Sequence, residues 1–117
     1  MFKVEILGNL GADATIKNHQ GRDFVSFRVA HSEKWVDTNT GEVHERTMWA
    51  SCALNGNGGN LTPYLKKGVK VFIRGNANIN VYSSPMTHRM EAGLNVNVGE
   101  IELCGGLPKA ETNDNNN

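Results

Sequence analysis

Apolar and polar residues alternate over five segments of this chain, and this alternation predicts five β-strands. Polar or glycine-containing turns separate the segments. The segments cover residues 1–10, 23–35, 44–55, 69–82 and 88–103. In the last segment the apolar parity changes after Val98, so we expect a β-bulge near Gly99 and Glu100.

One short stretch has the pattern of a helix instead. Residues 60–67 contain an early proline and are followed by Gly68, which are typical start and stop signals of a short helix. Five strands with one short helix between the third and fourth strands is the element order of an OB-fold, an all-β, five-stranded Greek-key barrel. We therefore predict an OB-fold domain over residues 1–106. Residues 107–117 offer almost nothing to bury, so we expect them to form a disordered polar tail.

The alternation also places one tryptophan on the solvent side of its strand. The apolar side of the third segment comprises Met48, Ala50, Cys52 and Leu54. Trp49 therefore falls on the opposite face, where an exposed indole offers a flat surface to a partner. Trp35 has the parity of the apolar side of its own segment, so its exposure would require a bulge or a bend, and the pattern alone leaves its role open.

The fourth segment carries a second candidate platform on its outer face, where Tyr82 shares the parity of Arg74. Phe72 has the same parity, and we expect a neighbouring element or subunit to cover it. His31 continues the apolar parity of the second segment, so we expect a hydrogen-bonded interior histidine rather than a metal ligand.

Composition limits the possible classes of protein. A chain of 117 residues that is 38% hydrophobic fits one compact domain. Lys plus Arg and Asp plus Glu both number 12, so the net charge is zero and any polyanion site must be local. We recognise no membrane span and no secretory signal, and we expect a cytoplasmic protein.

Motifs for catalysis or cofactor binding are not recognised in the sequence. Cys52 and Cys104 lie far apart without a CxxC partner, and the four histidines show no HExxH spacing. We find no GxSxG, no phosphate-binding GxxxxGK[ST] and no strand-GxGxxG-helix unit. We therefore predict neither an enzyme nor a metal or cofactor site, and interpret Cys52 as a small buried residue.

Binding of an unpaired nucleic acid has a mechanism that these residues can supply. Exposed aromatic rings stack on bases while nearby cations follow the backbone, at about 1–3 kcal/mol per stacked base. A duplex hides the faces of its bases, so exposed tryptophans favour a single strand as ligand.

Seven short motifs extend this interpretation to a family. They are ILGNLG (residues 6–11), FRVA (27–30), SEKW (32–35), TGE (40–42), TMW (47–49), YLKKG (64–68) and VFIRG (71–75). In this order and spacing, from Lys3 to about Gly106, the chain resembles the bacterial single-stranded DNA-binding proteins of the replicative type. The resemblance implies an OB-fold that assembles, usually as a homotetramer, and wraps single-stranded DNA during replication, recombination and repair.

The resemblance also implies a set of contact residues. The stacking tryptophans of the family correspond to Trp35 and Trp49, which makes Trp35 an expected contact, and a third tryptophan corresponds to Tyr82. The basic positions correspond to Lys3, Lys17, Lys66 and Lys67. With Arg74 from the outer face of the fourth segment, these residues complete the expected DNA-binding set.

Several positions depart from the family pattern. Asn55 replaces a phenylalanine, and Ser51 stands where a basic residue is common. The fourth strand of relatives often ends in basic residues, whereas this chain has Asn76, Asn78 and Asn80. We expect weaker binding than in a typical member and a flatter salt dependence, since the log–log slope for single strands is roughly −0.7 per neutralised phosphate.

Family members usually carry a long tail with an acidic tip that recruits other enzymes, whereas this sequence stops at Asn117 without one. Recruitment through a tip is therefore not predicted, and the chain is either truncated or a short member from a mobile element or specialised system. A protein-interaction or assembly module, with Trp49 and Phe72 buried against a partner, is the alternative that the neutral charge and Asn55 favour. An RNA-binding domain of cold-shock type is less well supported, because the RNP-like aromatic cluster is missing.

Overall fold

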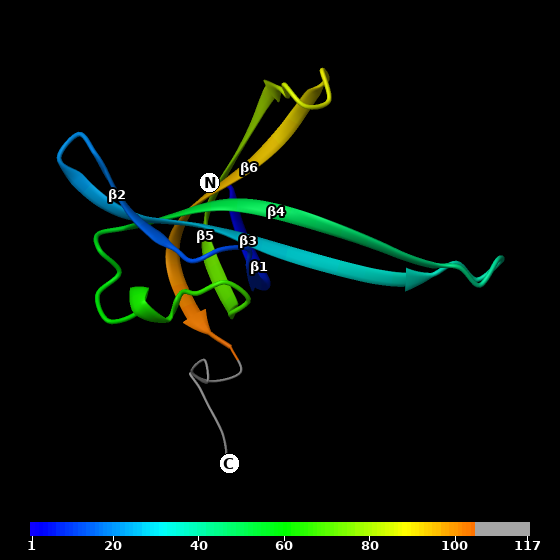
Figure 1. The fold of residues 1–117 in the computed structure, drawn as a ribbon, viewed down its shortest axis with the longest axis horizontal. Helices are drawn as coiled ribbons and strands as arrows, with labels where there is room; N and C mark the ends of the chain where they lie inside the picture. Colours follow the sequence, from blue (N-terminus) through cyan, green and yellow to red (C-terminus); the bar gives the residue numbers. More distant parts are fainter. Residues whose placement is uncertain (105–117) are drawn as a thin grey trace, which may run out of the picture.

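Six β-strands and one 3-10 turn make up the part of the chain that the computed structural model describes, residues 1–104 (Figure 1). The elements are β1 (Lys3–Leu10), β2 (Thr15–His19), β3 (Arg22–Val36), β4 (Val43–Asn55), η1 (Thr62–Tyr64), β5 (Lys70–Ser83) and β6 (Met90–Leu103). No helix within residues 1–104 is long and apolar enough to cross a membrane. The expected tail, residues 107–117, and the last two residues of the predicted domain lie outside the described residues.

Five of the strands close into a barrel in the order β1-β5-β6-β4-β3. β3 returns to β1 through the pairs Asn9–Ala30 and Leu10–Val29, while β4 and β6 run parallel and the other neighbours antiparallel. This arrangement confirms the predicted OB-fold. The five predicted strands are all present, with ends within two residues of the expected positions.

The strand β2 was not predicted, because its five residues are all exposed and only Ile16 among them is strongly apolar. It pairs with β3 as a hairpin, with His19 opposite Arg22. Gln20 and Gly21 form the two-residue turn and both have positive φ, at 53° and 82°. Positive φ at both central positions is the geometry of a type I′ hairpin turn, whose twist matches that of the flanking strands.

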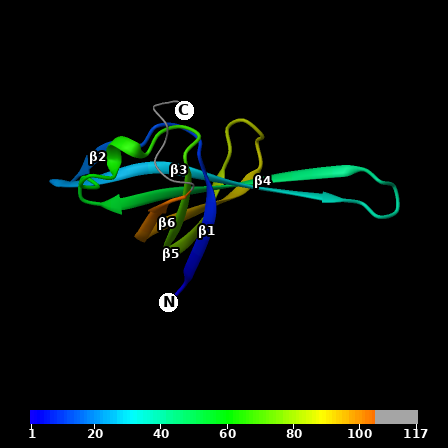
Figure 2. The same cartoon turned by 90° about the horizontal axis from the view of Figure 1, so that it is seen from below.

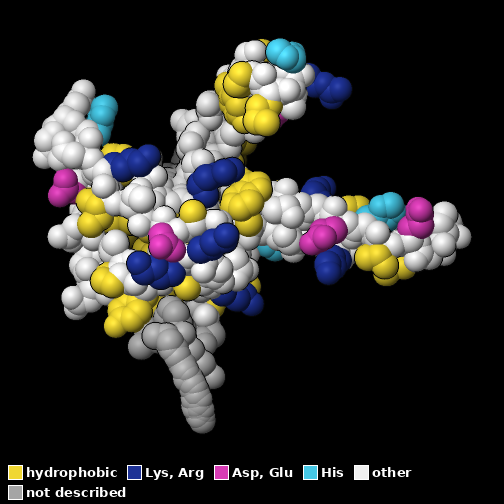
Figure 3. Space-filling view, in the orientation of Figure 1, with side chains coloured by type: hydrophobic (Ala, Val, Ile, Leu, Met, Phe, Trp, Pro, Cys, Tyr) yellow, Lys and Arg dark blue, Asp and Glu magenta, His cyan; other side chains and the backbone are white. Residues whose placement is uncertain are grey.

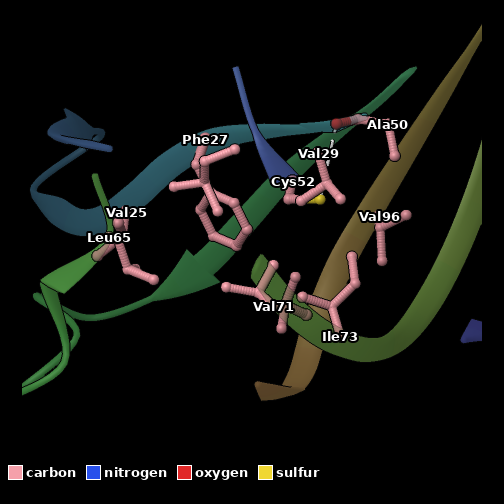
Figure 4. Packing of buried hydrophobic residues seen from close by; sticks show 11 residues of the cluster. Val25, Phe27, Val29, Ala50, Cys52, Leu65, Val71, Ile73 and Val96 are labelled. Atoms are coloured by element: carbon pink, nitrogen blue, oxygen red, sulfur yellow. Dashed lines mark hydrogen bonds between the residues drawn. The ribbon is translucent and has the colours of Figure 1, made fainter. Parts of the chain in front are cut away.

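The barrel interior confirms the alternation on which the prediction rested. Figure 4 shows side chains from β3, β4, β5 and β6 pointing into the space between the strands. Met48, expected on the apolar side of β4, is 44% exposed because it lies where β4 has left the barrel. The buried core consists of Leu10, Val25, Phe27, Val29, Ala50, Cys52, Leu65, Val71, Ile73, Val96 and Val98.

The expected bulge in the last strand is present. Arg74 pairs with Glu100 and the next residue, Gly75, pairs with Val98, so Gly99 has no partner across the ladder. A Cβ at Gly75 would clash with the backbone carbonyl of Asn97. The bulge therefore lies where the backbone of β6 leaves no room for a side chain at Gly75 of β5.

The short helix expected over residues 60–67 is present only as the 3-10 turn Thr62–Tyr64, so its expected length is wrong. Leu65 leaves the turn with ψ 75° and is buried to 1% exposure, and its carbonyl accepts a hydrogen bond from Ala14 N at 2.8 Å. The Asp13 carboxylate accepts another from the backbone N of Lys67 at 2.8 Å. Bonds to the β1–β2 connection thus replace the hydrogen bonds that a longer helix would make.

Two hairpins project beyond the barrel, as Figures 1 and 2 show. We call residues 31–48 of β3 and β4 the β3–β4 arm, and residues 78–95 of β5 and β6 the β5–β6 arm. The β3–β4 register runs without interruption from Phe24–Asn55 to Val36–Val43. Most side chains near the ends of both arms are exposed, on both faces of each ribbon, because no second layer covers them.

Candidate nucleic-acid interface

Trp49 lies on the outer face of β4 and is 43% exposed, which confirms the orientation predicted from strand alternation. Its six-membered ring rests on Gly11, where a Cβ would come within 2.6 Å of the indole Cζ3. The Arg28 guanidinium lies over the indole, 4.5 Å from the ring centroid. Contacts with the Gly11 backbone and the Arg28 guanidinium therefore restrict the orientation of the Trp49 ring.

Arg28 is absent from the expected contact set, although its parity indicates an outward position. It pairs with Ser51, two residues beyond Trp49, so the diagonal contact between Arg28 and Trp49 follows from the register. A pocket of about 210 Å³ opens beside them, lined in part by Asp13 and Ser26. Arg28 is exposed and adds a delocalised cation to the aromatic surface.

Trp35 is 47% exposed on the β3–β4 arm. Its ring stacks on His44, directly opposite, at a centroid distance of 5.5 Å and an interplanar angle of 25°. The guanidinium of Arg46 lies 5.8 Å from the Trp35 ring centroid. The expectation that exposure requires a bulge or a bend is wrong, because the register is continuous and the arm simply extends past the barrel.

The two tryptophans lie on opposite faces of the β3–β4 ribbon. Trp35 keeps the parity of Val29, whereas Trp49 pairs with Ala30 on the other side. Successive residues of a strand point to opposite faces, so the continuous register fixes this relation. One ligand can contact both rings only by following the twist of the ribbon or by crossing its edge.

A chain of polar contacts lies at the base of the same arm. Glu33 accepts hydrogen bonds from Arg46 at 2.8 Å and from His31 Nε2 at 3.3 Å, while His31 Nδ1 lies 2.9 Å from the Leu7 carbonyl. The Leu7 carbonyl, followed by Glu33, raises the pKa of His31, and Arg46, followed by His31, lowers the pKa of Glu33. His31 is hydrogen-bonded as expected, but its side chain is 38% exposed rather than interior.

Tyr82 lies on the β5–β6 arm and is 44% exposed. It pairs with Glu91, and its ring crosses β6 toward Gly93, where a Cβ would lie 3.3 Å from the Tyr82 Cε1. Because Gly93 has no side chain, the Tyr82 ring can pack over the backbone of β6 at this position. The phenol ring is partly exposed in this position.

Arg74 is bound to two carboxylates on the outer face of the barrel. Its Nε lies 2.6 Å from Glu5 and its Nη1 lies 2.7 Å from Glu100. Glu100, then Glu5, raises the pKa of Arg74, and the guanidinium also covers half-buried Phe72 at 5.5 Å from the ring centroid. The charge of Arg74 is thus balanced within the barrel.

The four expected lysines are all exposed, but they are not gathered into one cluster of contacts. Lys66 Nζ lies 3.9 Å from Asp13, which lines the pocket beside Trp49. Lys3 is opposite Asn76 at the start of β1, and Lys17 is on the β2 hairpin. Figure 3 shows Lys and Arg side chains scattered over the visible face of the barrel body and on both arms.

Within residues 1–104 we find neither a metal-binding cluster nor a reactive Cys52 thiol. Residues 1–104 contain no group of three or more His, Cys, Asp or Glu side chains that could hold a metal ion. Burial raises the pKa of Cys52 to about 12, so this thiol stays protonated at neutral pH. Cys52 is a buried core residue, as predicted.

Comparisons with known proteins agree with this geometry. The sequence profile described as "Single-strand binding protein family" matches residues 1–104. A single-stranded DNA-binding protein of Rhizobium meliloti (strain 1021) is 41% identical over 76 residues, which cover 62% of this chain and 44% of that protein. The chain thus spans less than half the length of this curated relative.

Two solved structures share the fold. A Plasmodium falciparum SSB in complex with single-stranded DNA superposes with a TM-score of 0.65 at 23% identity, covering 88% of this chain and 92% of the other. A small single-stranded DNA-binding protein of Streptomyces coelicolor has a TM-score of 0.69 at 14% identity, with 87% and 93% covered. At these identities the likeness concerns the fold alone.

Proposed function

Because this chain belongs to the single-strand binding protein family, we propose that it binds and protects single-stranded DNA without sequence specificity during replication, recombination and repair. The observation that carries the proposal is the set of three exposed aromatic rings, Trp35, Trp49 and Tyr82, placed on the barrel face and the two arms. Each ring is 43–47% exposed and has polar or cationic neighbours, as base stacking beside a phosphate backbone requires.

The rings stack with bases and the exposed cations follow the backbone. We assign phosphate contacts to the four lysines and add Arg28, whose guanidinium can slide from the Trp49 ring to a phosphate when a base takes its place. Arg74 is assigned to support the barrel instead, since two carboxylates already bind it. The phosphate-contacting residues are Lys3, Lys17, Arg28, Lys66 and Lys67.

We further propose that the protein assembles, as a homotetramer, in the bacterial cytoplasm where its ligand is found. The outer face of β1 and β5 carries exposed Leu7 beside half-buried Phe72, an apolar surface that a second copy can cover. Binding by stacking and ion pairing needs no chemical step and no cofactor, so we propose a non-enzymatic role.

The direct test is intrinsic tryptophan fluorescence during titration with oligo-dT, with a duplex of matched length as control, at two salt concentrations. We expect saturable quenching by the single strand alone. Trp49→Ala should weaken binding roughly 5- to 150-fold, as expected for one lost stacking contact of about 1–3 kcal/mol. Trp49→Phe keeps an aromatic face and should lose less; equal affinity of all three proteins would remove Trp49 from the site.

An assembly module with weak or no DNA binding is the second candidate. It is favoured by a pocket of about 270 Å³ at the base of the β3–β4 arm, lined by exposed Leu7 and Met48 among others. Under this alternative the titration shows no quenching. Sedimentation would then show self-association that both Leu7→Glu and Trp49→Ala weaken.

A further inference from the structure

One face of the β5–β6 arm and its base consists mainly of asparagines. Strand alternation gives them a common face, and the register pairs Asn76 with Asn97 and Asn78 with Asn95. All are exposed. Alternate residues of a strand are about 6.7 Å apart, so amides recur along this face at an interval close to that of nucleotides in an extended single strand. The face consists of Asn76, Asn78 and Asn80 on β5 and Asn95 and Asn97 on β6.

The same stretch has almost no charge with which to bind phosphate. Residues 75–87 and 91–98 contain no Lys or Arg, and their one charged side chain is the carboxylate Glu91, directly opposite Tyr82. The one arginine of the arm, Arg89, lies in the turn at its tip. A phosphate beside Tyr82 would meet the Glu91 carboxylate directly opposite, while Arg89 lies two residues farther toward the tip of the arm. If a nucleotide binds at this arm, its uncharged part, the base, is therefore the part that the surface suits.

Tyr82 and Asn80 lie next to each other above one glycine. A Cβ at Gly93 would lie 3.3 Å from the Tyr82 Cε1 and 3.2 Å from the Asn80 Oδ1. Asn95 Nδ2 donates a hydrogen bond to the same Asn80 oxygen at 2.6 Å, which ties the two amides together across the strands. An aromatic face and a pair of oriented amides thus adjoin at this point.

We propose that Asn80 and Asn95, together with Tyr82, form a subsite that recognises the hydrogen-bonding edge of an unpaired base. The inference rests on the proposed function and deepens it. After their mutual bond, Asn80 retains its NH₂ group and Asn95 retains its carbonyl oxygen, so the pair offers both donors and an acceptor. A base stacked on the Tyr82 ring extends its edge in a plane parallel to the ring, toward these amides.

The subsite adds affinity that salt does not weaken, because neutral hydrogen bonds release no counterions. It also accepts any base, since every unpaired base carries adjacent donors and acceptors on its Watson–Crick edge. The amides therefore replace phosphate contacts without introducing sequence specificity.

The test compares two oligomers that differ only at the base edge. One is fluorescein-labelled oligothymidylate, and the other has the same length but is built from N3-methylthymine, which stacks but has lost its edge donor. Anisotropy titrations with the wild-type chain should give tighter binding of the unmodified oligomer by roughly three- to tenfold, as expected for one net hydrogen bond. The ratio of the two affinities should be the same when the titrations are repeated at a second, higher salt concentration.

Three variants show where the discrimination arises. In the double variant Asn80→Ala/Asn95→Ala the ratio should fall toward one, whereas Asn60→Ala, an exposed asparagine before η1, should keep the wild-type ratio. Tyr82→Ala should weaken binding of both oligomers, as loss of a stacking face predicts. A wild-type ratio in the double variant, or equal losses for both oligomers, would overturn the subsite. Failure of the wild-type chain to bind either oligomer would overturn the proposed function itself.

Discussion

Among single residues, Gly11 has the most direct effect on the candidate interface. A Cβ there would come within 2.6 Å of the Trp49 ring, so Gly11→Ala must displace the indole. We expect a shifted tryptophan emission spectrum and weaker binding of oligo-dT, with little change in thermal stability because the ring is on the surface. Gly99→Ala is a suitable control, since its Cβ would meet only the Arg74 carbonyl at 3.7 Å; an identical effect of both variants would contradict the assigned role of Gly11.

His31 gives a second prediction for a single residue. The Leu7 carbonyl and Glu33 raise its pKa in the folded state above the ordinary 6.5. Protonated His31 therefore stabilises the fold fully below pH 6.5, and this contribution is lost as the pH rises through the raised pKa of the folded state. In an NMR titration His31 should titrate above its ordinary value of 6.5. Glu33→Gln should lower the pKa of His31, and an unchanged value would show that the carboxylate does not contribute.

Between neighbouring strands, the clearest contact is Arg74, which joins β1, β5 and β6 through Glu5 and Glu100. Arg74→Ala should lower the melting temperature slightly, because two carboxylates lose their shared partner, and added salt should reduce the difference. The affinity for oligo-dT should not change. A loss of affinity as large as that of Lys66→Ala would return Arg74 to the DNA-binding set.

The elements also show what local pattern can and cannot reveal. Residues that point into the barrel alternate so regularly that all five barrel strands, and the bulge at Gly99, could be predicted from sequence. β2 could not, because an exposed hairpin strand has no buried face to produce a pattern. The helix expected near Pro63 is only a 3-10 turn because Leu65 is anchored to Ala14, a contact between distant parts of the chain.

The two tryptophans also differ in whether their exposure could be predicted from sequence. Trp49 could be placed from parity alone, since its neighbours on β4 are core residues. Trp35 could not, because its exposure depends on how far the β3–β4 arm extends past the barrel, which depends on the lengths of the other strands. Arg28 and Gly11 could be connected to Trp49 only after the register and the barrel closure were known.

For the molecule as a whole, the zero net charge limits how strongly salt can affect binding. Five proposed phosphate contacts give a log–log slope of at most about −3.5 with single strands. Lys17→Ala should make the slope shallower by roughly 0.7 while leaving tryptophan quenching at saturation unchanged. Titrations over a range of salt concentrations measure both quantities, and a slope that stays the same would place Lys17 outside the path of the DNA.

The opposite orientation of Trp35 and Trp49 on one ribbon has a mechanical consequence. A single-stranded DNA that stacks on both rings must bend around the β3–β4 arm to pass from one face to the other. Tension on the two ends of the DNA would straighten it and peel it from one ring before the other. Release under tension should therefore occur in two steps, and an optical trap should record two separate extensions of the DNA.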